Sequence, residues 1–309
     1  LYRVVFFNFG SLLYTPFPIY RYNKEKGINF LRLYLYSKYR YVLYRIEIGL
    51  LKLLRVNVFV QYQGSDARQK DYCRSNFEVM LPEHSKSYTW NDRLKDENKR
   101  EQIKRLEQVA QGIFSLNPDL MHVLPSRTKF LPYSHIDLEI WKPRPCRASD
   151  YKNVLKIGHA PSNRDVKGTD QILEVIEDLH SSHGTSFKFH LIENIPYNKV
   201  MDTYQSIDVL IDQIYAGWYG GLAVELMALG KPVLSYIRED DLKFIPPEMA
   251  ESLPIINTCP ENLKQNLISL IEMPYDELVE LGIKSRQYVE KWHCPPKVVG
   301  RLIEDLNLC

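Results

Sequence analysis

Four short apolar segments in the second half of the chain alternate with three segments of helical character. The strand-like segments are rich in Val, Ile and Leu and cover residues 153–158, 187–192, 208–212 and 232–237. The helix-like segments between them cover residues 169–184, 196–207 and 222–230. The first of these helices has Thr169 as its N-cap and places four apolar residues on one stripe, namely Ile172, Leu173, Ile176 and Leu179. This alternation predicts a parallel sheet with covering helices, so the expected fold class is α/β.

The first half of the chain is less regular but contains the same two kinds of segment. Strands are expected there at residues 2–9, 56–62 and 112–116, and helices at residues 39–54 and 97–111. In the second half, three more helices are expected after the alternating segments, at residues 261–271, 275–291 and 296–306. Prolines and charges replace periodicity within residues 131–153, which predicts a linker there. Since 309 residues suffice for two domains of ordinary size, we expect domains at residues 1–145 and 146–309. The last helix is expected to pack back on the first domain.

Composition narrows the class of protein. Hydrophobic residues make up 45% of the chain and charged residues 25%, which is ordinary for a soluble globular protein. The formal net charge of +2 excludes the strongly basic character of a nucleic-acid-binding protein. No apolar run reaches the roughly 18 residues of a membrane span, and no signal-peptide pattern is present. We therefore expect a cytoplasmic protein. The chain begins at Leu1 within a strand-like segment, so we also expect residues upstream to be missing.

Metal binding is not predicted. The five cysteines, which are Cys73, Cys146, Cys259, Cys294 and Cys309, lie far apart and form no Cys-x-x-Cys or Cys/His spacing. Their odd number and scatter favour reduced thiols. No Asp-x-Asp pair follows a predicted strand. We expect neither a metal ion nor a cofactor.

A glycine-rich turn precedes the helix at 222–230 in the sequence GWYGGLAVELMALGKPV, residues 217–233. Ligands of parallel α/β sheets bind beyond the carboxyl ends of the strands, and glycines let the backbone approach a ligand closely. The free N–H groups of a helix start favour a phosphate. Glu225 is expected in the first helical turn, where its carboxylate can accept hydrogen bonds from the vicinal hydroxyls of a ribose. Alternatively, Glu225 stabilises the helix dipole alone.

A second polar segment follows the strand at 153–158. Residues 158–171 place Arg164 and Lys167 just before a helix. Arg offers a planar fork and Lys a point charge, and the two together suit a diphosphate. The alternative is a basic loop that is merely solvated.

These two segments resemble the nucleotide-sugar half of GT-B glycosyltransferases, in the retaining, family-4-like group with the "glycosyl transferases group 1" domain. The resemblance covers residues 153–300 and includes "ELMALGKPV", in which Glu225 matches the second glutamate of a Glu-x7-Glu element. It implies two Rossmann-like domains facing a cleft, the first short or N-terminally truncated. The implied donor-binding residues are Ser162, Asn163, Arg164, Lys167, Gly168, Tyr219, Gly220, Gly221, Leu222 and Glu225. The implied nucleobase-side residues are Glu193, Asn194 and Ile195.

Two departures from the family pattern bear on catalysis. Gly217 stands where many members carry the first glutamate, which is expected near the transferred sugar, and Asp212 or Gln213 is the candidate replacement. In the first domain, Gln63 replaces the usual histidine in Gln63-Gly64-Ser65-Asp66. Glutamine can hydrogen-bond a sugar hydroxyl but cannot titrate as histidine does.

The segment Gln63-Gly64-Ser65-Asp66 is also where the acceptor substrate is expected to bind. Gln63, Gly64 and Arg68 are the candidate acceptor-side residues, and Asp66 joins Arg164 and Lys167 as a candidate catalytic residue. Alternatively, Asp66 and Arg68 form a local turn with an ion pair. The segment FLPYSHID, residues 130–137, is expected to contact both domains.

Residues 20–45 are dense in tyrosine, lysine and arginine. The first interpretation is a tyrosine-rich amphipathic helix that covers the core. The second is contact with an anionic membrane surface, where tyrosine lies at headgroup depth. Single-stranded nucleic acid is the weakest of the three interpretations because of the nearly neutral charge.

The resemblance implies a glycosyltransferase that moves a sugar from a nucleotide-diphosphate sugar, UDP- or GDP-linked, to a hydroxyl acceptor. Retention and a role in surface polysaccharide or glycolipid synthesis, at the inner face of the membrane, come by the same analogy. Two other interpretations stay open. One is a non-catalytic nucleotide-sugar-binding or scaffold protein of a glycan assembly complex, and the other is an epimerase of the same fold.

Overall fold

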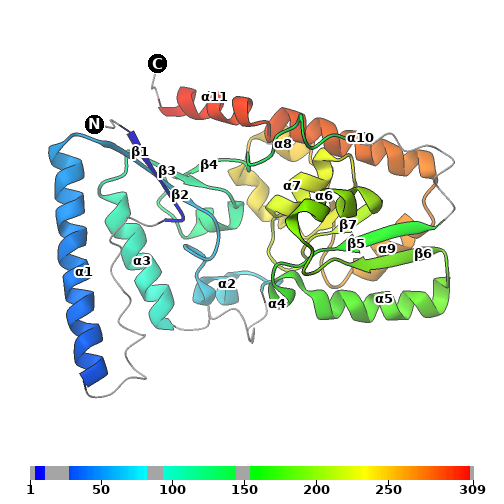
Figure 1. Cartoon of the computed structure of the whole chain (residues 1–309), viewed down its shortest axis with the longest axis horizontal. Coiled ribbons are helices and arrows are strands. Elements are labelled where there is room, and N and C mark those ends of the chain that lie inside the picture. The colour runs from blue at the N-terminus through cyan, green and yellow to red at the C-terminus, as the bar shows by residue number, and fades with distance from the viewer. Residues whose placement is uncertain (1–3, 11–27, 82–92, 144–153, 307–309) are drawn as a thin grey trace. The chain divides into compact units, whose positions relative to one another are not determined.

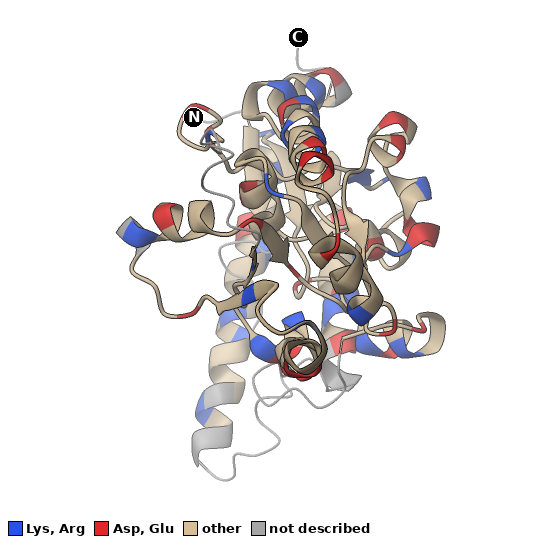
Figure 2. Ribbon diagram, turned by 90° about the vertical axis from the view of Figure 1, so that its right-hand side faces the viewer, with Lys and Arg blue, Asp and Glu red and all other residues tan. Residues whose placement is uncertain are grey.

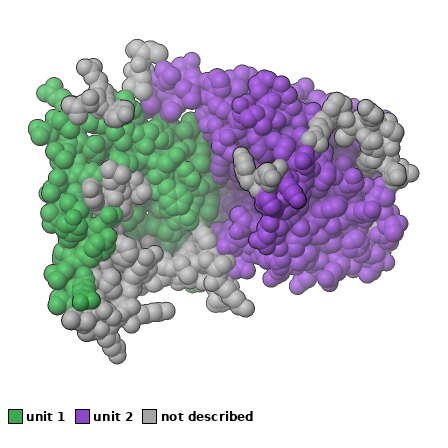
Figure 3. Space-filling view, viewed as in Figure 1, with its two compact units in different colours: residues 1–77, 89–131 green, residues 78–88, 132–309 purple. Residues whose placement is uncertain are grey.

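The computed structural model describes residues 4–10, 28–81, 93–143 and 154–306. The chain divides into two compact units, one of residues 1–77 with 89–131 and one of residues 78–88 with 132–309 (Figure 3). Each unit contains its own parallel sheet, so the predicted α/β class is confirmed. The domain limits of 1–145 and 146–309, and the packing of the last helix on the first domain, stay predictions.

The first unit is built on four parallel strands in the order β1 (Val4–Asn8), β2 (Asn57–Tyr62), β3 (Gly112–Ser115) and β4 (Lys129–Phe130). Its helices are α1 (Ile28–Leu53), α2 (Lys70–Asn76), α3 (Arg93–Glu107) and the short 3₁₀ turn η2 (Pro118–His122). Strand β2 is buried almost throughout, as expected of a parallel strand covered on both faces. Tyr44 of α1 and Ile103 of α3 belong to the core that covers it. Helix α1 begins well before the predicted residue 39, while residues 20–27 lie outside the described part of the chain.

The second unit has five parallel strands in the order β6 (Phe187–Leu191), β5 (Leu155–His159), β7 (Val209–Ile211), β8 (Val233–Ser235) and β9 (Ile256–Asn257). Its longer helices are α5 (Thr169–His183), α6 (Tyr197–Ser206), α7 (Gly221–Ala228), α9 (Leu263–Ile271), α10 (Tyr275–Trp292) and α11 (Pro295–Leu306). Shorter turns are α4 (Arg164–Lys167), η4 (Glu239–Phe244) and α8 (Pro247–Glu251). Figure 1 shows α5 and α9 on one side of this sheet and α7 and α10 on the other. The strands and helices predicted between residues 153 and 306 are all present, with ends shifted by a few residues.

The strand order of the second unit creates a switch point. From β5 the chain runs through α4 and α5 to β6, on one side of β5. From β7, which lies on the other side of β5, the chain runs through α7 to β8, farther away. Because connections from two neighbouring strands leave in opposite directions, a crevice for ligands is expected at the carboxyl ends of β5 and β7.

The predicted N-cap of α5 was wrong. Thr169 is the first residue of this helix, and the N-cap is Gly168, whose φ of 77° lies in the left-handed region. A Cβ atom at residue 168 would lie 2.5 Å from an Ile214 carbon, so the position needs glycine for space as well as for conformation. The Thr169 hydroxyl instead lies 2.9 Å from Nε2 of His159, at the end of β5.

No helix in the described ranges combines the length and the apolar character required to cross a membrane.

Candidate functional site

Lys167 and Asp212 meet at the carboxyl ends of β5 and β7. The Lys167 ammonium donates to Asp212 Oδ1 at 2.5 Å, and the Gly220 amide donates to Asp212 Oδ2 at 2.7 Å. The Asp212 side chain is fully buried, and that of Lys167 is 9% exposed. One carboxylate therefore holds together a cation from the loop after β5 and the amide at the N-cap of α7. These are two of the donors that the sequence assigns to a phosphate.

His159, the last residue of β5, makes hydrogen bonds to residues that are close in sequence to Lys167 and Asp212. Its Nδ1 lies 2.8 Å from the Ile211 carbonyl oxygen, which can only accept, so Nδ1 carries the proton and Nε2 accepts from the Thr169 hydroxyl. Burial lowers the pKa of His159 to about 4, with the nearby positive charge of Lys167 acting in the same direction. The imidazole is therefore neutral near pH 7 and connects β5, β7 and the start of α5.

Arg164 lies in the single-turn helix α4, one turn before Lys167, and forms a two-pronged ion pair with Glu193. Its Nε and Nη2 donate to the two Glu193 carboxylate oxygens at 2.8 and 2.6 Å. The hydrogen bond from Arg164 lowers the pKa of Glu193. The Arg164 side chain is about half exposed, in contrast to buried Lys167. Arg164 is thus a surface cation whose partner lies on the loop after β6.

Neighbouring candidate residues shape these two loops. The Asn163 side chain caps α4 by accepting from the Val166 amide at 3.2 Å, and Ser162 is exposed. On the loop after β6, Asn194 has a φ of 55° and is exposed, and Ile195 is half-buried.

Glu225 lies on α7 and contacts His135. Nε2 of His135 is 3.3 Å from Glu225 Oε1, and both side chains are partly exposed. Because α7 begins at Gly221, Glu225 falls beyond the first turn, which corrects the sequence prediction. The charges of Glu225 and Asp212 both act on Tyr204 of α6. Burial raises the pKa of this phenol to about 12, and the charges of both carboxylates add to the shift.

His135 was absent from the predicted binding residues. A Cβ atom at Gly221 would lie 3.1 Å from its ring, so His135 covers the first residue of α7. Its only signal in the sequence was its place in a segment expected to contact both domains.

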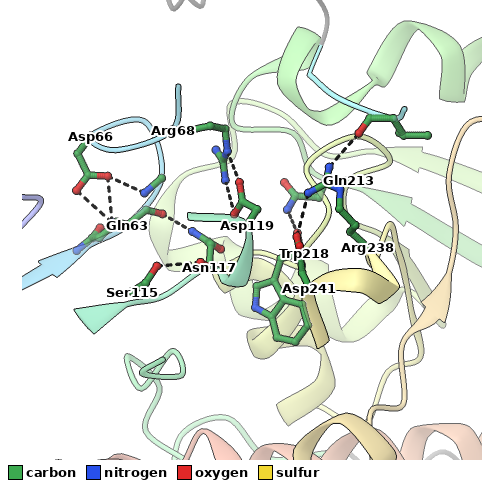
Figure 4. Close-up of polar contacts among 12 residues, drawn as sticks. Gln63, Asp66, Arg68, Ser115, Asn117, Asp119, Gln213, Trp218, Arg238 and Asp241 are labelled. Atoms are coloured by element: carbon green, nitrogen blue, oxygen red, sulfur yellow. Dashed lines mark hydrogen bonds and ion pairs between the residues drawn. The ribbon is translucent and has the colours of Figure 1, made fainter. Parts of the chain in front are cut away.

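Glycine is required by the structure at residue 217, the position that the resemblance aligns with a glutamate. The φ of Gly217 is 77°, and a Cβ atom there would lie 2.5 Å from an Arg238 guanidinium nitrogen. The Arg238 guanidinium pairs with Asp241 at 3.1 Å and donates to the Val79 carbonyl at 2.9 Å (Figure 4). The neighbouring Gln213 amide donates to the Trp218 carbonyl oxygen. A buried arginine thus occupies the space that a side chain at 217 would enter.

The Tyr219 side chain belongs to a buried polar cluster. Its hydroxyl lies 2.9 Å from His293 Nε2 and 3.1 Å from the Tyr288 hydroxyl, while His293 Nδ1 lies 2.7 Å from the Tyr133 carbonyl oxygen. Burial lowers the pKa of His293 to about 4. The cluster therefore holds Tyr219, the residue before Gly220, in place. Leu222, the second residue of α7, is half-buried.

The first unit places its candidate residues in a tight turn after β2. The Asp66 carboxylate accepts from the Gly64 amide at 2.7 Å and from the Gln63 amide at 3.1 Å, and burial raises its pKa (Figure 4). Arg68 pairs with Asp119 at 2.6 Å. The charge of Arg68 also acts on Asp66 and lowers its pKa, against the larger effect of burial. The local turn is present, and an ion pair between Asp66 and Arg68 stays a prediction.

Among the described residues, no group of three His, Cys, Asp or Glu side chains is placed to hold a metal ion.

Comparison with solved structures identifies the fold. Anabaena HepE in complex with UDP and glucose aligns with a TM-score of 0.55 and 11% identity, over 85% of this chain and 75% of that chain. Sucrose-phosphate synthase from Thermosynechococcus elongatus aligns with a TM-score of 0.58 and 15% identity, over 99% of this chain and 74% of that chain. A mutant of S. aureus TarM in complex with fondaparinux, alpha-GlcNAc-glycerol and UDP aligns with a TM-score of 0.54 and 12% identity, over 81% of this chain and 51% of that chain.

These similar structures are GT-B glycosyltransferases, and the GT-B class with Rossmann-like domains is confirmed for this chain. At such low identity the likeness establishes the fold alone. No family model matches the sequence, and no curated protein matches it. The family-4-like, retaining assignment stays a prediction.

Proposed function

We propose that this protein is a glycosyltransferase that moves a sugar from a nucleotide-diphosphate sugar to a hydroxyl acceptor. The observation that carries the proposal is the meeting of the Lys167 ammonium and the Gly220 amide at the switch point between β5 and β7. A GT-B fold is compatible with many functions, so the proposal depends on the chemistry of this site.

The donor diphosphate would take the place that the Asp212 carboxylate now holds. A phosphate presents the same kind of acceptor oxygens as a carboxylate, and the amides at the start of α7 favour a negative charge. Lys167 would then stabilise the charge that develops on the leaving diphosphate. Arg164, which is more exposed, would add a two-pronged contact by exchanging Glu193 for phosphate oxygens.

The nucleoside would lie beside the diphosphate. Glu225 is partly exposed on α7 and would accept hydrogen bonds from the ribose hydroxyls, with His135 as its neighbour. The loop that carries Glu193, Asn194 and Ile195 would face the base. Anabaena HepE was crystallised with UDP, which favours UDP over GDP as the first nucleotide to assay.

In the reaction, the bond between the anomeric carbon and the diphosphate oxygen breaks, and a bond to the acceptor oxygen forms with retention. The proton of the acceptor hydroxyl passes to the leaving diphosphate. Lys167 stabilises the leaving group in the place where other enzymes use a metal ion, so EDTA is expected to leave the rate unchanged. Asp66 in the first unit is the candidate catalytic carboxylate on the acceptor side, together with Gln63, Gly64 and Arg68. The acceptor we propose is a surface polysaccharide or a glycolipid.

The test combines binding and turnover. Thermal-shift measurements with UDP, GDP, ADP, CMP and their sugars identify the donor, because a ligand of the folded state raises Tm. With that donor, Lys167→Ala should lower kcat/KM by roughly 100- to 1,000-fold, as expected for loss of a charge-stabilising group. Lys264→Ala, which removes an exposed lysine paired with Asp178, should leave kcat/KM unchanged. Equal activity of both variants would contradict the proposal.

One observation favours a second function, that of a non-catalytic nucleotide-sugar-binding protein. Gly217 and Arg238 close the position where the family's first glutamate stands. If the protein binds a nucleotide sugar at the Lys167 site but forms neither a transfer product nor free sugar, this second function is the correct one.

A further inference from the structure

The outer face of α1 is a long apolar surface. Seven of its residues recur every three or four positions and are each 50–77% exposed: Leu31, Leu35, Tyr39, Val42, Ile46, Leu50 and Leu53. We call these seven residues the α1 stripe. Contiguous exposed apolar surface of this kind marks a contact with a partner or a membrane, because single exposed residues are common and long rows of them are not.

The opposite side of the same helix holds α1 on its own unit. Tyr44 is buried in the core of the first unit, and Ile48 and Leu51 pack against that core. On a helix that turns roughly 100° per residue, these residues lie about 180° from the α1 stripe. The stripe is therefore not the face that α1 needs for folding, and its apolar character calls for another explanation.

Basic residues line the stripe. Lys38, Arg45 and Lys52 are exposed and seven residues apart, which places them in one row along the helix. Arg32 is exposed on the other flank of the stripe. Glu47 is the only acidic residue between Ile28 and Leu53. Figure 2 shows Lys and Arg recurring along this helix.

Tyrosines flank the stripe on both sides, with Tyr34 and Tyr41 next to the basic row and Tyr36 on the flank of Arg32. All three are 39–45% exposed, and the Lys38 ammonium lies 5.4 Å from the centre of the Tyr34 ring. A tyrosine combines an apolar ring with a polar hydroxyl, so it is suited to the boundary between lipid and water. Apolar, aromatic and basic side chains thus occur together on one side of α1.

We propose that the α1 stripe docks on the surface of an anionic lipid bilayer, with the helix lying along the membrane plane. Leu, Val and Ile side chains would enter the boundary between headgroups and acyl chains, and the basic row would contact acidic headgroups. The inference does not depend on the donor site, because every residue that carries it lies in α1.

Charge and shape favour lipid over two other occupants. In an antiparallel symmetric dimer formed through this face, the basic rows of the two copies would lie on the same side and repel each other. A single-stranded nucleic acid would satisfy the cations but would leave the aliphatic stripe in water, since bases stack on aromatic rings. An acidic bilayer complements both the charge and the apolar side chains.

The first experiment is co-sedimentation with vesicles of phosphatidylcholine, with and without phosphatidylglycerol. The full chain should pellet with the acidic vesicles, and Leu35→Glu, Val42→Glu and Ile46→Glu together should abolish this binding. The matched control places glutamates at three exposed apolar positions of the second unit, Ile140, Ile283 and Val299, and should bind as wild type does. Lack of binding by the wild type, or unchanged binding by the α1 variant, overturns the proposal.

A second variant tests the charges without touching the stripe. Replacing Lys38, Arg45 and Lys52 by glutamine should weaken binding to acidic vesicles on the order of 100-fold. It remains informative if the glutamate variant fails to fold. Two other results would overturn the proposal. One is a wild-type dimer that the stripe variant dissociates, and the other is tight binding to single-stranded DNA that depends on the basic row alone.

Discussion

Lys167 and Asp212 form a buried ion pair, 2.5 Å between Nζ and Oδ1, across the carboxyl ends of β5 and β7. The second oxygen of the carboxylate accepts from the Gly220 amide. Asp212 therefore supplies, within the protein, the negative charge that a bound diphosphate would supply. Under the proposed function, stability and ligand binding would therefore depend on the same atoms.

Asp212→Asn should lower the free energy of unfolding and increase the extent to which pyrophosphate stabilises the protein. Removal of one partner leaves a buried charge without compensation, which costs about 3–5 kcal/mol. Pyrophosphate or UDP should restore part of that loss, because its oxygens replace the carboxylate at Lys167. Urea unfolding with and without ligand measures both effects.

Asp241→Asn is the matched control for this variant. Asp241 pairs with buried Arg238 at 3.1 Å, so its replacement should also lower the free energy of unfolding. Pyrophosphate should not restore that loss. If pyrophosphate stabilises both variants and the wild type to the same extent, Asp212 does not compete with the ligand.

Glu225→Gln should weaken binding of ribonucleotides selectively. A hydrogen bond to a charged group contributes about 1.5–3 kcal/mol, so the affinity for UDP should fall roughly 10- to 150-fold. A 2′,3′-dideoxy analogue of UDP lacks the hydroxyls and should bind wild type and variant alike. Titration calorimetry measures the affinity of both nucleotides for wild type and variant. An equal loss of affinity for the two nucleotides would show that Glu225 does not contact the ribose hydroxyls.

Gly217→Glu should destabilise the protein rather than restore the family's first glutamate. A non-glycine residue in the left-handed region costs about 1–2 kcal/mol, and the new side chain must also displace the Arg238 guanidinium. Gly230→Glu separates the two effects, because Gly230 has a φ of 71°, close to that of Gly217, but a Cβ atom there meets nothing nearer than 3.5 Å. The free energy of unfolding should be highest for the wild type, lower for Gly230→Glu and lowest for Gly217→Glu. An equal loss of unfolding free energy in the two variants would mean that the Arg238 guanidinium moves aside at little cost.

Acidification should destabilise the second unit through two buried histidines. Burial lowers the pKa of His159 and of His293 to about 4 in the folded protein, while an unfolded histidine titrates at about 6.5. Between these values the unfolded chain binds protons that the folded protein does not, so stability falls as pH drops from about 6.5 to 4. Each histidine accounts for about 3 kcal/mol of this loss.

Replacement of one histidine tests this assignment. In His293→Gln, the slope of unfolding free energy against pH should decrease by the contribution of one proton over the same pH interval. A slope equal to that of wild type would show that His293 is accessible to protons in the folded protein.

The regular part of the fold could be predicted from periodicity, and the ends of the helices less well. Short apolar runs with helices between them identified the parallel sheet of the second unit, because a buried parallel strand has to be apolar on both faces. Helix α1 begins at Ile28, earlier than predicted. Because it is apolar on the α1 stripe and also on the opposite side that packs on the core, its sequence lacks the clear polar face by which an amphipathic helix is recognised. Thr169 has the chemistry of an N-cap, yet a contact with His159 decides its position.

The sequence by itself determined which strands form, which of them end in glycines and basic residues, and hence where a phosphate site is to be sought. Only the tertiary structure decided which charges meet. Asp212 pairs with Lys167, Glu193 with Arg164 and Glu225 with His135, and each pair is separated by at least 29 residues. Such pairs depend on strand order, above all on β7 lying beside β5, because side chains pair with what is near them in space and not along the chain. For buried Asp212 a partner is also an energetic requirement.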